Sequence, residues 1–323
     1  MTYKVFVDGQ EGTTGLQIHE RLAKRNDIEI LVIDPEKRKE PSERAKLINA
    51  SDITFLCLPD VAAKESVSLC SSTSTKIIDA STAHRTNPEF AYGLPELSNV
   101  LREKLKTSTR IANPGCHATG FLLGVSPLRQ VGILPSSSHL ACYSITGYSG
   151  GGKKLIAEYE AEGAQVSTPG ASLSLFAPSP YALALKHKHL PEMKLYADLE
   201  KAPLFNPVLG PFYKGMAVSV ALFPEMFTKK VSPKDIQEIL ATHYENSRFV
   251  KVMPYAETPD LPSGRLDATL CNDTNEAKVY VFGNEESFQV TTIIDNLGKG
   301  ASGAAVECLN IVLGNDDTKG LEI

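Results

Sequence analysis

One cysteine of this chain lies where a reactive thiolate would form readily. Cys116 follows a short stretch at 110–112, which predicts the end of a strand, and Pro114 and Gly115, which predict a tight turn. The pattern at 118–130 predicts a helix that begins directly after this cysteine. A thiol in the first turn of a helix faces unpaired N–H groups and the positive end of the helix dipole, so its pKa falls. We therefore favour a nucleophile over a buried structural cysteine.

A glycine-rich loop connects an apolar stretch at 3–7 to a predicted helix at 14–25. Its glycines have the spacing GxxGxxG, and a backbone without side chains can turn sharply and approach a phosphate. The N-terminus of the following helix offers N–H donors to the same phosphate. The strand, loop and helix together predict a dinucleotide site formed by Gly9, Gly12, Thr13, Thr14 and Gly15.

The residues after the second predicted strand bear on the choice of nucleotide. Asp34 ends that strand, where an acidic side chain commonly binds the ribose hydroxyls of NAD. Lys37 and Arg38 follow in a basic run that could hold the 2′-phosphate of NADP. We favour NADP, and a site for NAD governed by Asp34 is the alternative.

Two histidines are candidates for proton transfer. The segment 181–189 alternates in the period of a strand, so His187 and His189 would point to one side, about 6–7 Å apart. An imidazole has a pKa suited to exchanging a proton with a developing alkoxide or aldehyde oxygen. We favour His189, at the end of the predicted strand, and His187 is the alternative. A third ligand is missing nearby, so we expect no metal.

Five further polar residues occupy turns where ligands are commonly bound. A serine and an arginine follow a predicted strand at 76–79, at the edge where parallel sheets bind ligands. A serine and a lysine enclose three glycines before a predicted helix at 153–162, and an asparagine lies in a tight turn at 295–300. Ser81, Arg85, Ser149 and Lys153 are candidates for binding substrate, and Asn296 for binding the cofactor.

Composition excludes several classes of protein. The 323 residues are 42% hydrophobic and 22% charged, which is ordinary for a globular chain long enough for two domains. A formal charge of −5 argues against nucleic acid as a partner. The six cysteines are scattered, which opposes a zinc site or a disulfide framework. We see no leader and no apolar run near the ~18 residues of a membrane span, and expect a cytoplasmic protein without a membrane partner.

The order of predicted elements indicates two folds in one chain. Strands and helices alternate over the first third, as in an α/β, Rossmann-type, doubly wound parallel sheet. Longer alternating strands follow, with a capped helix at 232–243, as in an α+β domain with a mostly antiparallel sheet. We expect a dinucleotide-binding domain at 1–115, a catalytic and dimerisation domain at 116–297, and a C-terminal helix at 298–323 that packs back on the first domain. The longer strands are expected at 139–145, 215–223, 278–282 and 288–294.

Taken together, these segments resemble the N-acetyl-gamma-glutamyl-phosphate reductases of arginine biosynthesis, in their shorter form. The matching stretches run through the whole chain in order, and the two most discriminating are TGYSGGGK and HKHLPEM. The stretches are GQEGTTG at 9–15, DASTAHR at 79–85, YGLPEL at 92–97, NPGCHATG at 113–120, TGYSGGGK at 146–153, HKHLPEM at 187–193 and DNLGKGASG at 295–303.

The resemblance implies a reaction and a set of roles. NADPH would reduce N-acetyl-glutamyl 5-phosphate, a small acyl phosphate, to the 5-semialdehyde with release of phosphate. Cys116 would form a thioester with the substrate, which divides one difficult step into two easier ones. His189 or His187 would act as acid and base. The family also forms homo-oligomers, so a dimer or tetramer is expected.

Three other readings compete with this one. An aspartate-semialdehyde dehydrogenase, or another acyl-phosphate reductase of the same superfamily, would share NPGC. A cysteine hydrolase would share the thiol and a histidine but would leave the glycine loop without a purpose. A regulator that senses NADP would keep the loop but would not need a thiol at a helix start.

Overall fold

The computed structural model describes residues 2–161, 175, 177–257 and 260–323. The chain divides into two compact units, of which the first combines Met1–Gly115 with Ala301–Ile323 and the second is Cys116–Gly300. Among the described residues, no helix is both long and apolar enough to cross a membrane.

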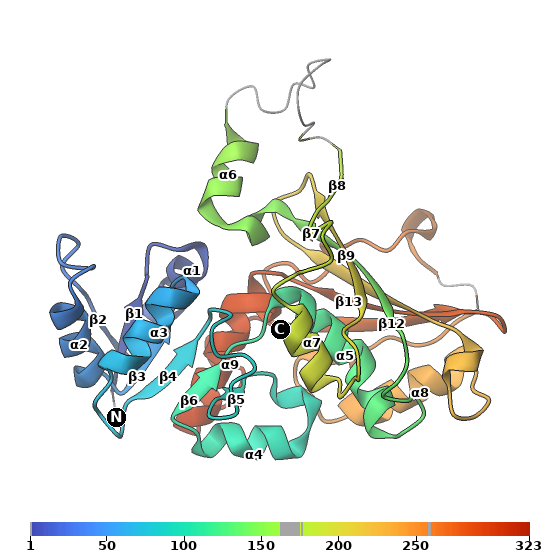
Figure 1. Ribbon diagram of the computed structural model, residues 1–323, viewed down its shortest axis with the longest axis horizontal. Coiled ribbons are helices and arrows are strands. Elements are labelled where there is room, and N and C mark those ends of the chain that lie inside the picture. Colours follow the sequence, from blue (N-terminus) through green and yellow to red (C-terminus); the bar gives the residue numbers. More distant parts are fainter. Residues whose placement is uncertain (1, 162–174, 176, 258–259) are drawn as a thin grey trace. The chain divides into compact units, whose positions relative to one another are not determined.

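The first unit is built on a sheet whose strand pairs are all parallel (Figure 1). The strand order is β2-β1-β3-β4-β6-β5, so the chain moves outward from β1 in both directions. This is the doubly wound arrangement that the sequence predicts. Its strands are β1 (Tyr3–Asp8), β2 (Ile28–Leu31), β3 (Ile53–Leu56), β4 (Lys76–Asp79), β5 (Ala91–Tyr92) and β6 (Arg110–Ala112).

Helices cover the parallel sheet, with α1 packed beside α9 and α2 beside α3. Every residue of α9 from Gly303 to Val312 is buried, because this helix packs against α1, α4 and β4. Burial on all sides explains why most of its residues are apolar, with Glu307 and Asn310 as the buried polar exceptions. The helices are α1 (Thr13–Ala23), α2 (Pro41–Ala50), α3 (Asp60–Leu69), α4 (Asn99–Thr107), α9 (Gly303–Leu313) and a 3₁₀ turn at Pro95–Leu97.

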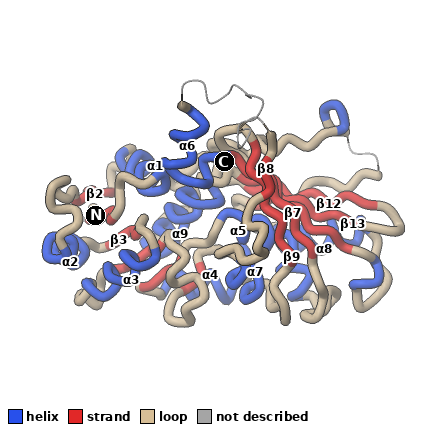
Figure 2. Tube along the Cα trace, turned by 45° about the horizontal axis from the view of Figure 1, so that its top comes forward, coloured by secondary structure: helices blue, strands red, loops and turns tan. Residues whose placement is uncertain are grey.

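The second unit contains a mixed sheet in the order β11-β12-β13-β10-β7-β9-β8. Its pairs are antiparallel except for β11 with β12 and β7 with β9, which are parallel. Figure 2 shows these strands side by side. They are β7 (Ala141–Gly147), β8 (Ser179–Pro180), β9 (Leu204–Gly210), β10 (Met216–Leu222), β11 (Val250–Val252), β12 (Ala277–Gly283) and β13 (Phe288–Ile294).

Helix α5 packs on this sheet against β10 and β13 and also contacts α7 and α8, whereas α8 packs directly on β11 and β12. Gly120 allows close approach, because a Cβ there would lie 2.5 Å from a methyl carbon of Val218. The helices are α5 (Cys116–Gln130), α6 (Gly152–Glu160), α7 (Leu190–Tyr196) and α8 (Pro233–Tyr244), with a π-helical turn at Gly298–Ser302 and 3₁₀ turns at Tyr148–Gly151, Pro224–Met226 and Pro262–Gly264.

The fold class is confirmed, but one predicted strand is wrong. Within 181–189, β8 has already ended at Pro180 and the chain forms turns. Ala182 and Leu185 have φ values of 53° and 55°, which a strand does not allow. Helices α2 and α4 and strand β9 were not predicted, and the last expected residue of the helix at 153–162 lies outside the described residues.

Candidate active site

Cys116 is the first residue of α5, and its side chain is partly exposed. Three other cysteines, Cys142, Cys271 and Cys308, are buried. Burial raises the pKa of Cys142, and it raises the pKa of Cys271 to about 11. Cys116 instead combines exposure with the N-terminus of a helix of 15 residues, the setting that favours a thiolate.

A glycine provides the space that Cys116 occupies. A Cβ on Gly300 would lie 2.7 Å from the Cβ of Cys116, closer than two carbon atoms approach without a bond. The backbone N–H of Gly300 donates to the carbonyl of Asp295, at a distance of 3.0 Å. The turn after β13 is therefore fixed against the start of α5, and only a residue without a side chain fits there.

The structure brings the two predicted histidines close to each other, although not on a strand. The ring centroids of His187 and His189 are 4.7 Å apart, and His189 is buried. The backbone N–H of His189 lies 3.2 Å from Nδ1 of His187, which accepts it. Because an accepting nitrogen carries no proton, this bond favours the neutral form of His187. The contact leaves His189 as the better carrier of a proton.

A third histidine, His117, was missed by the sequence analysis. Its ring lies 5.4 Å from that of His187 and 5.5 Å from that of His189, between centroids. Its Nδ1 lies 2.8 Å from Oγ of Ser144, and its Nε2 lies 2.8 Å from the hydroxyl of Tyr181. Adjacency to Cys116 was the only signal in the sequence that could have found it.

Electrostatics set the charge of this third imidazole. Burial is the main cause that lowers the pKa of His117 to about 3, and electrostatic repulsion from the Lys188 ammonium and from a protonated form of His187 adds to it. The ring is therefore neutral near pH 7 and carries one N–H and one accepting nitrogen. Among the described residues, no group of three or more His, Cys, Asp or Glu side chains is arranged to hold a metal ion.

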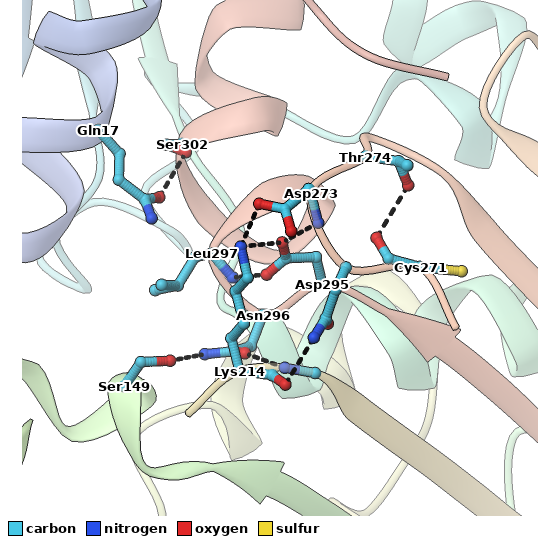
Figure 3. A network of polar contacts seen from close by, with 12 residues as sticks. Gln17, Ser149, Lys214, Cys271, Asp273, Thr274, Asp295, Asn296, Leu297 and Ser302 are labelled. Carbon is cyan, nitrogen blue, oxygen red and sulfur yellow. Dashed lines mark hydrogen bonds and ion pairs between the residues drawn. The ribbon is translucent and has the colours of Figure 1, made fainter. Parts of the chain in front are cut away.

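The predicted residues Ser149 and Asn296 meet directly in the second unit (Figure 3). Nδ2 of Asn296 donates to Oγ of Ser149 at 3.0 Å, and Oδ1 of Asn296 accepts the backbone N–H of Gly215 at 2.8 Å. Both side chains are buried. Asn296 thus holds the glycine-rich turn after β7 to the turn before β10.

A second part of this network surrounds Asp295, which the sequence analysis did not select. Its carboxylate accepts the backbone N–H groups of Leu297 and Asp273, each at 2.8 Å. Lys214 forms an ion pair with Asp273 and lies 3.8 Å from the carboxylate of Asp295 (Figure 3). These bonds fix the turn that carries Asn296. By contrast, Lys153 lies exposed in the first turn of α6.

In the first unit, the side chains of Ser81 and Arg85 form hydrogen bonds to other groups of the protein. Oγ of Ser81 donates to Asp79 at 2.8 Å. Nε of Arg85 donates to the carbonyl of Asn113 at 2.9 Å, and another guanidinium nitrogen lies 3.3 Å from the carbonyl of Ala80. Arg85 therefore connects the turn after β4 with the residues that precede Cys116 in the chain.

The glycine loop has the local geometry of a phosphate site. Gly9 has a φ of 90°, and a Cβ on Gly15 would lie 2.4 Å from the carbonyl oxygen of Gly9. Gly12 is the N-cap of α1 and provides no side-chain acceptor to the first turn. The hydroxyl of Thr13 is buried and has no hydrogen-bond partner among the residues that the structure describes. The N–H groups in the first turn of α1 and the Thr13 hydroxyl can therefore donate hydrogen bonds to an anion, such as the phosphate of a dinucleotide.

The basic run after β2 is exposed, and it reaches the glycine loop. Arg38 forms an ion pair with Glu11, a residue of that loop. Lys37 and Asp34 are exposed beside it. The guanidinium of Arg38 thus stands near the glycines at the position where a 2′-phosphate would need a cation.

Comparisons with known proteins agree with this geometry. A family model described as semialdehyde dehydrogenase, NAD binding domain, matches residues 36–108, and one described as semialdehyde dehydrogenase, dimerisation domain, matches residues 116–296. An N-acetyl-gamma-glutamyl-phosphate reductase 2 of Nostoc sp. is 46% identical over 98% of this chain and 99% of its own length. The chain belongs to the N-acetyl-gamma-glutamyl-phosphate reductases. A reductase of the same name from Brucella canis is 43% identical over 97% of this chain and 100% of its own.

Solved structures show that this reductase shares its fold with a related family. Aspartate semialdehyde dehydrogenase II of Vibrio cholerae, in complex with ASA, has a TM-score of 0.74 at 14% identity and covers 97% of this chain and 99% of its own. The enzyme of Candida albicans, solved with NADP, has a TM-score of 0.65 at 14% identity and the same coverage. At these identities the likeness to the solved structures concerns the fold alone, whereas the two relatives in sequence described above are named as reductases.

Proposed function

We propose that the protein reduces N-acetyl-glutamyl 5-phosphate to N-acetyl-glutamate 5-semialdehyde, with release of phosphate, as a step of arginine biosynthesis. The observation that carries this proposal is the partly exposed thiol of Cys116 at the start of α5. Membership of the reductase family supports the same substrate. An acyl phosphate is an activated acyl group, which suits a sulfur nucleophile.

Cys116 performs the covalent step. Its thiolate attacks the acyl carbon, the bond from that carbon to the phosphate oxygen breaks, and phosphate leaves with the electron pair. The product is a thioester on Cys116. NADPH, when bound, supplies the hydride that reduces this acyl group. The carbon–sulfur bond then breaks, the aldehyde leaves, and the thiolate is restored.

A histidine acts as the general acid and base that donates a proton to the reacting oxygen and takes it back. We assign this role to His189, because Nδ1 of His187 is already engaged by the backbone N–H of His189. His187 then fixes the loop that carries His189. Neutral His117 supports both rings from the first turn of α5.

Separate groups hold the rest of the substrate. The exposed ammonium of Lys153 and the hydroxyl of Ser149 follow β7, where they would bind the phosphate or a carboxylate. Asn296 was expected to contact the cofactor, but its amide binds Ser149 and Gly215, so we assign it to positioning Ser149. Ser81 and Arg85 were expected to bind substrate, and their contacts favour a role in fixing the segment before Cys116.

The cofactor residues lie in the first unit. The N–H groups at Thr13, Thr14 and Gly15 would bind the pyrophosphate, together with the hydroxyl of Thr13, which no other described residue binds. The space beside Gly12 is open enough for the pyrophosphate to approach its backbone. A Cβ there would lie no closer than 3.4 Å to the described atoms, the nearest being the carbonyl oxygen of Gly9. Lys37 and Arg38 would bind the 2′-phosphate and so favour NADPH.

An assay of the reverse reaction tests this function against its rivals. The purified protein is given N-acetyl-glutamate semialdehyde or aspartate semialdehyde, with and without phosphate, and NADP or NAD. We expect phosphate-dependent reduction of NADP with the acetylated aldehyde. A preference for aspartate semialdehyde would overturn the substrate, and turnover without phosphate would overturn the acyl-phosphate chemistry.

We also propose that two copies associate through the outer face of the second sheet. Tyr143 on β7 is 50% exposed, and Leu204 on β9 is 51% exposed. On β12, the rings of Tyr280 and Phe282 stack with their centroids 5.8 Å apart. Aromatic residues are typical of interface cores. In sedimentation velocity, Tyr280→Glu should dissociate the oligomer, and Val61→Glu, at a residue of α3 that is 84% exposed, should not. An unchanged sedimentation coefficient for Tyr280→Glu would exclude this face.

A further inference from the structure

A buried ion pair joins the end of β1 to helix α2 in the first unit. Asp8, the last residue of β1, and Arg44 of α2 are both more than nine-tenths buried. Nε of Arg44 donates to Oδ2 of Asp8 at 3.2 Å, and Oγ of Ser66 on α3 donates to the same oxygen at 2.8 Å. One carboxylate oxygen therefore holds a strand and two helices together.

The guanidinium of Arg44 is bound at all three of its nitrogens. Nη1 donates to the carboxylate of Glu65 at 2.6 Å. Nη2 donates to the carbonyl of Ala62 at 3.3 Å and to the hydroxyl of Ser66, and these three acceptors all belong to α3. A planar fork bound in several directions fixes the orientation of the helix that carries it, which a lysine ammonium on a flexible stem does not. The network therefore sets the register of α2 against β1 and α3.

Stability alone does not explain why charges are buried at this place. Taking two charges out of water is costly, and apolar residues of similar volume in place of a buried ion pair are often as stable or more stable. Burial also raises the pKa of Asp8, because desolvation disfavours the charged form of its carboxyl group. The ion pair provides a defined direction, which an apolar contact does not. A directional contact matters where the two joined segments must keep a fixed distance.

The two segments that this pair joins are those expected to bind the phosphate groups of the cofactor. Asp8 directly precedes Gly9, where the glycine loop begins. On the other side, the backbone N–H of Arg44 donates to the carbonyl of Glu40 at 3.1 Å, and the N–H of Glu40 donates to the carbonyl of Lys37 at 2.8 Å. Hydrogen-bonded turns thus connect the basic run to Arg44, and a shift of Arg44 would move the run.

A second contact between the same segments lies at the surface. Arg38 and Glu11 form an ion pair, but their side chains are 45% and 57% exposed. Ion pairs this exposed are weak, because water and salt screen them. A bound 2′-phosphate would also compete with Glu11 for the guanidinium of Arg38. The distance between the glycine loop and the basic run therefore depends on the buried pair rather than on the surface pair.

We propose that Asp8 and Arg44 are positioning residues that hold the basic run at the distance from the glycine loop that NADPH requires, and so determine the preference for NADPH over NADH. The inference rests on the proposed function, in which the glycine loop binds the pyrophosphate and Lys37 and Arg38 bind the 2′-phosphate. NADH lacks the 2′-phosphate and does not use the basic run. Binding of NADH should therefore be insensitive to the position of that run.

The ratio of the Kd for NADH to the Kd for NADPH tests this role. Both constants are measured by cofactor fluorescence in the full-length protein. Arg44→Lys keeps the positive charge but loses the planar fork. The ratio should fall by about tenfold, the change expected when a hydrogen bond to a charged group is lost, while the Kd for NADH is unchanged.

Arg25→Lys is the matched control. Arg25 is also a buried arginine of the first unit, and its fork donates to both carboxylate oxygens of Asp27, at 3.0 and 2.8 Å, and to Oδ1 of Asn310 at 2.6 Å. These partners belong to neither the glycine loop nor the basic run. The control should lower the melting temperature and leave the ratio of the two constants unchanged.

Asp8→Asn separates an effect of position from a purely electrostatic effect. If the carboxylate of Asp8 only repels the phosphates of the cofactor, its loss should tighten binding of both NADPH and NADH. Positioning predicts the opposite for NADPH, because a neutral amide is a weaker acceptor for the guanidinium of Arg44 than a carboxylate is. A ratio that does not fall, in a folded Asp8→Asn or Arg44→Lys protein, would overturn the proposal.

Arg38→Ala shows whether the proposed function or the positioning fails. In that background Arg44→Lys should have little further effect on the ratio, since a positioning residue acts through the group that it positions. An equal further loss would mean that Arg44 acts independently of Arg38, and the positioning would be refuted. If Arg38→Ala alone leaves the ratio unchanged, the assigned 2′-phosphate site is wrong, and the positioning fails with it.

A double variant covers the case in which Arg44→Lys does not fold. Asp8→Leu combined with Arg44→Met replaces the ion pair by apolar side chains, a change that buried ion pairs often tolerate. The ratio should fall in this variant as well, because the directional contact is lost. A wild-type ratio in the folded double variant would contradict the proposal. Binding requires no turnover, so these results do not depend on whether the proposed reaction is correct.

Discussion

A Cβ placed on Gly300 would lie 2.7 Å from the Cβ of Cys116. Two segments that are 184 positions apart in the chain (300 − 116) therefore share one small space. The nucleophile is positioned by the absence of a side chain on its neighbour, as well as by the turn that precedes it.

Gly300→Ala should displace Cys116 and impair the covalent step. A misplacement of about 1 Å at a reacting group can lower the rate about a hundredfold, so kcat should fall strongly while cofactor binding is retained. The control is Gly314→Ala, at the left-handed C-cap of α9 (φ 68°), where no atom of the described residues lies within 4 Å of an added Cβ. It should lower the melting temperature and leave kcat unchanged. An unchanged kcat of Gly300→Ala would show that the turn after β13 can shift to accommodate the added methyl group.

Arg38→Ala should weaken binding of NADPH much more than binding of NADH. Loss of a hydrogen bond to a charged group is worth about 1.5–3 kcal/mol, or roughly a ten- to hundredfold change in Kd. Glu11→Gln, which removes the ion-pair partner of Arg38, should tighten NADPH binding. Cofactor fluorescence measures both constants, with Lys46→Ala on α2 as the control for net charge. Equal losses of affinity for NADPH and NADH would indicate a site for NAD, in which Asp34 binds the ribose hydroxyls.

Replacing each histidine of the pair should separate their roles. His189→Asn should lower kcat with little change in KM and remove one limb of the pH–rate profile. His187→Asn should act mainly through KM or stability, because Nδ1 of His187 holds the backbone of His189. If the limb disappears with His187→Asn and persists with His189→Asn, the assignment is reversed. If the limb of the pH–rate profile persists in both variants, neither histidine is the acid and base.

The titration of His117 should be absent from the physiological range. Its pKa is lowered to about 3, mainly by burial and further by electrostatic repulsion from Lys188 and from a protonated form of His187, whereas an unfolded histidine has a pKa of about 6.5. Between these values the unfolded chain binds a proton that the folded chain does not, so stability falls as pH drops below about 6.5. In ¹³C spectra of labelled histidine, one Cε1 signal, missing in His117→Gln, should not shift from pH 8 to 5. A midpoint near pH 6.5 for that signal would refute the assignment.

The sequence predicted the parts of the site that depend on local signals. Cys116 starts a helix because a proline and a glycine precede it, and the glycine loop lies between β1 and α1, so both could be read from short patterns. The alternation at 181–189 was misleading, because positive φ values at Ala182 and Leu185 break the strand that it suggested.

The missed parts depend on contacts between distant residues. His117 gains its role from Ser144 on β7 and from Tyr181 in a later loop, and no local pattern links the three. Asn296 was selected, but its partners Ser149 and Gly215 lie far from it in sequence. These partners cannot be read from the sequence, and contact of the Asn296 amide with the cofactor stays a prediction.

The covalent role of Cys116 is tested most directly by trapping its acyl adduct. The wild-type protein is mixed with N-acetyl-glutamyl 5-phosphate in the absence of NADPH, quenched in acid and digested for mass spectrometry. The account predicts a thioester-linked N-acetyl-glutamyl group on the peptide that contains Cys116, and neither adduct nor turnover in a folded Cys116→Ser protein that still binds cofactor. An adduct on another residue, or near-wild-type activity of Cys116→Ala, would contradict it.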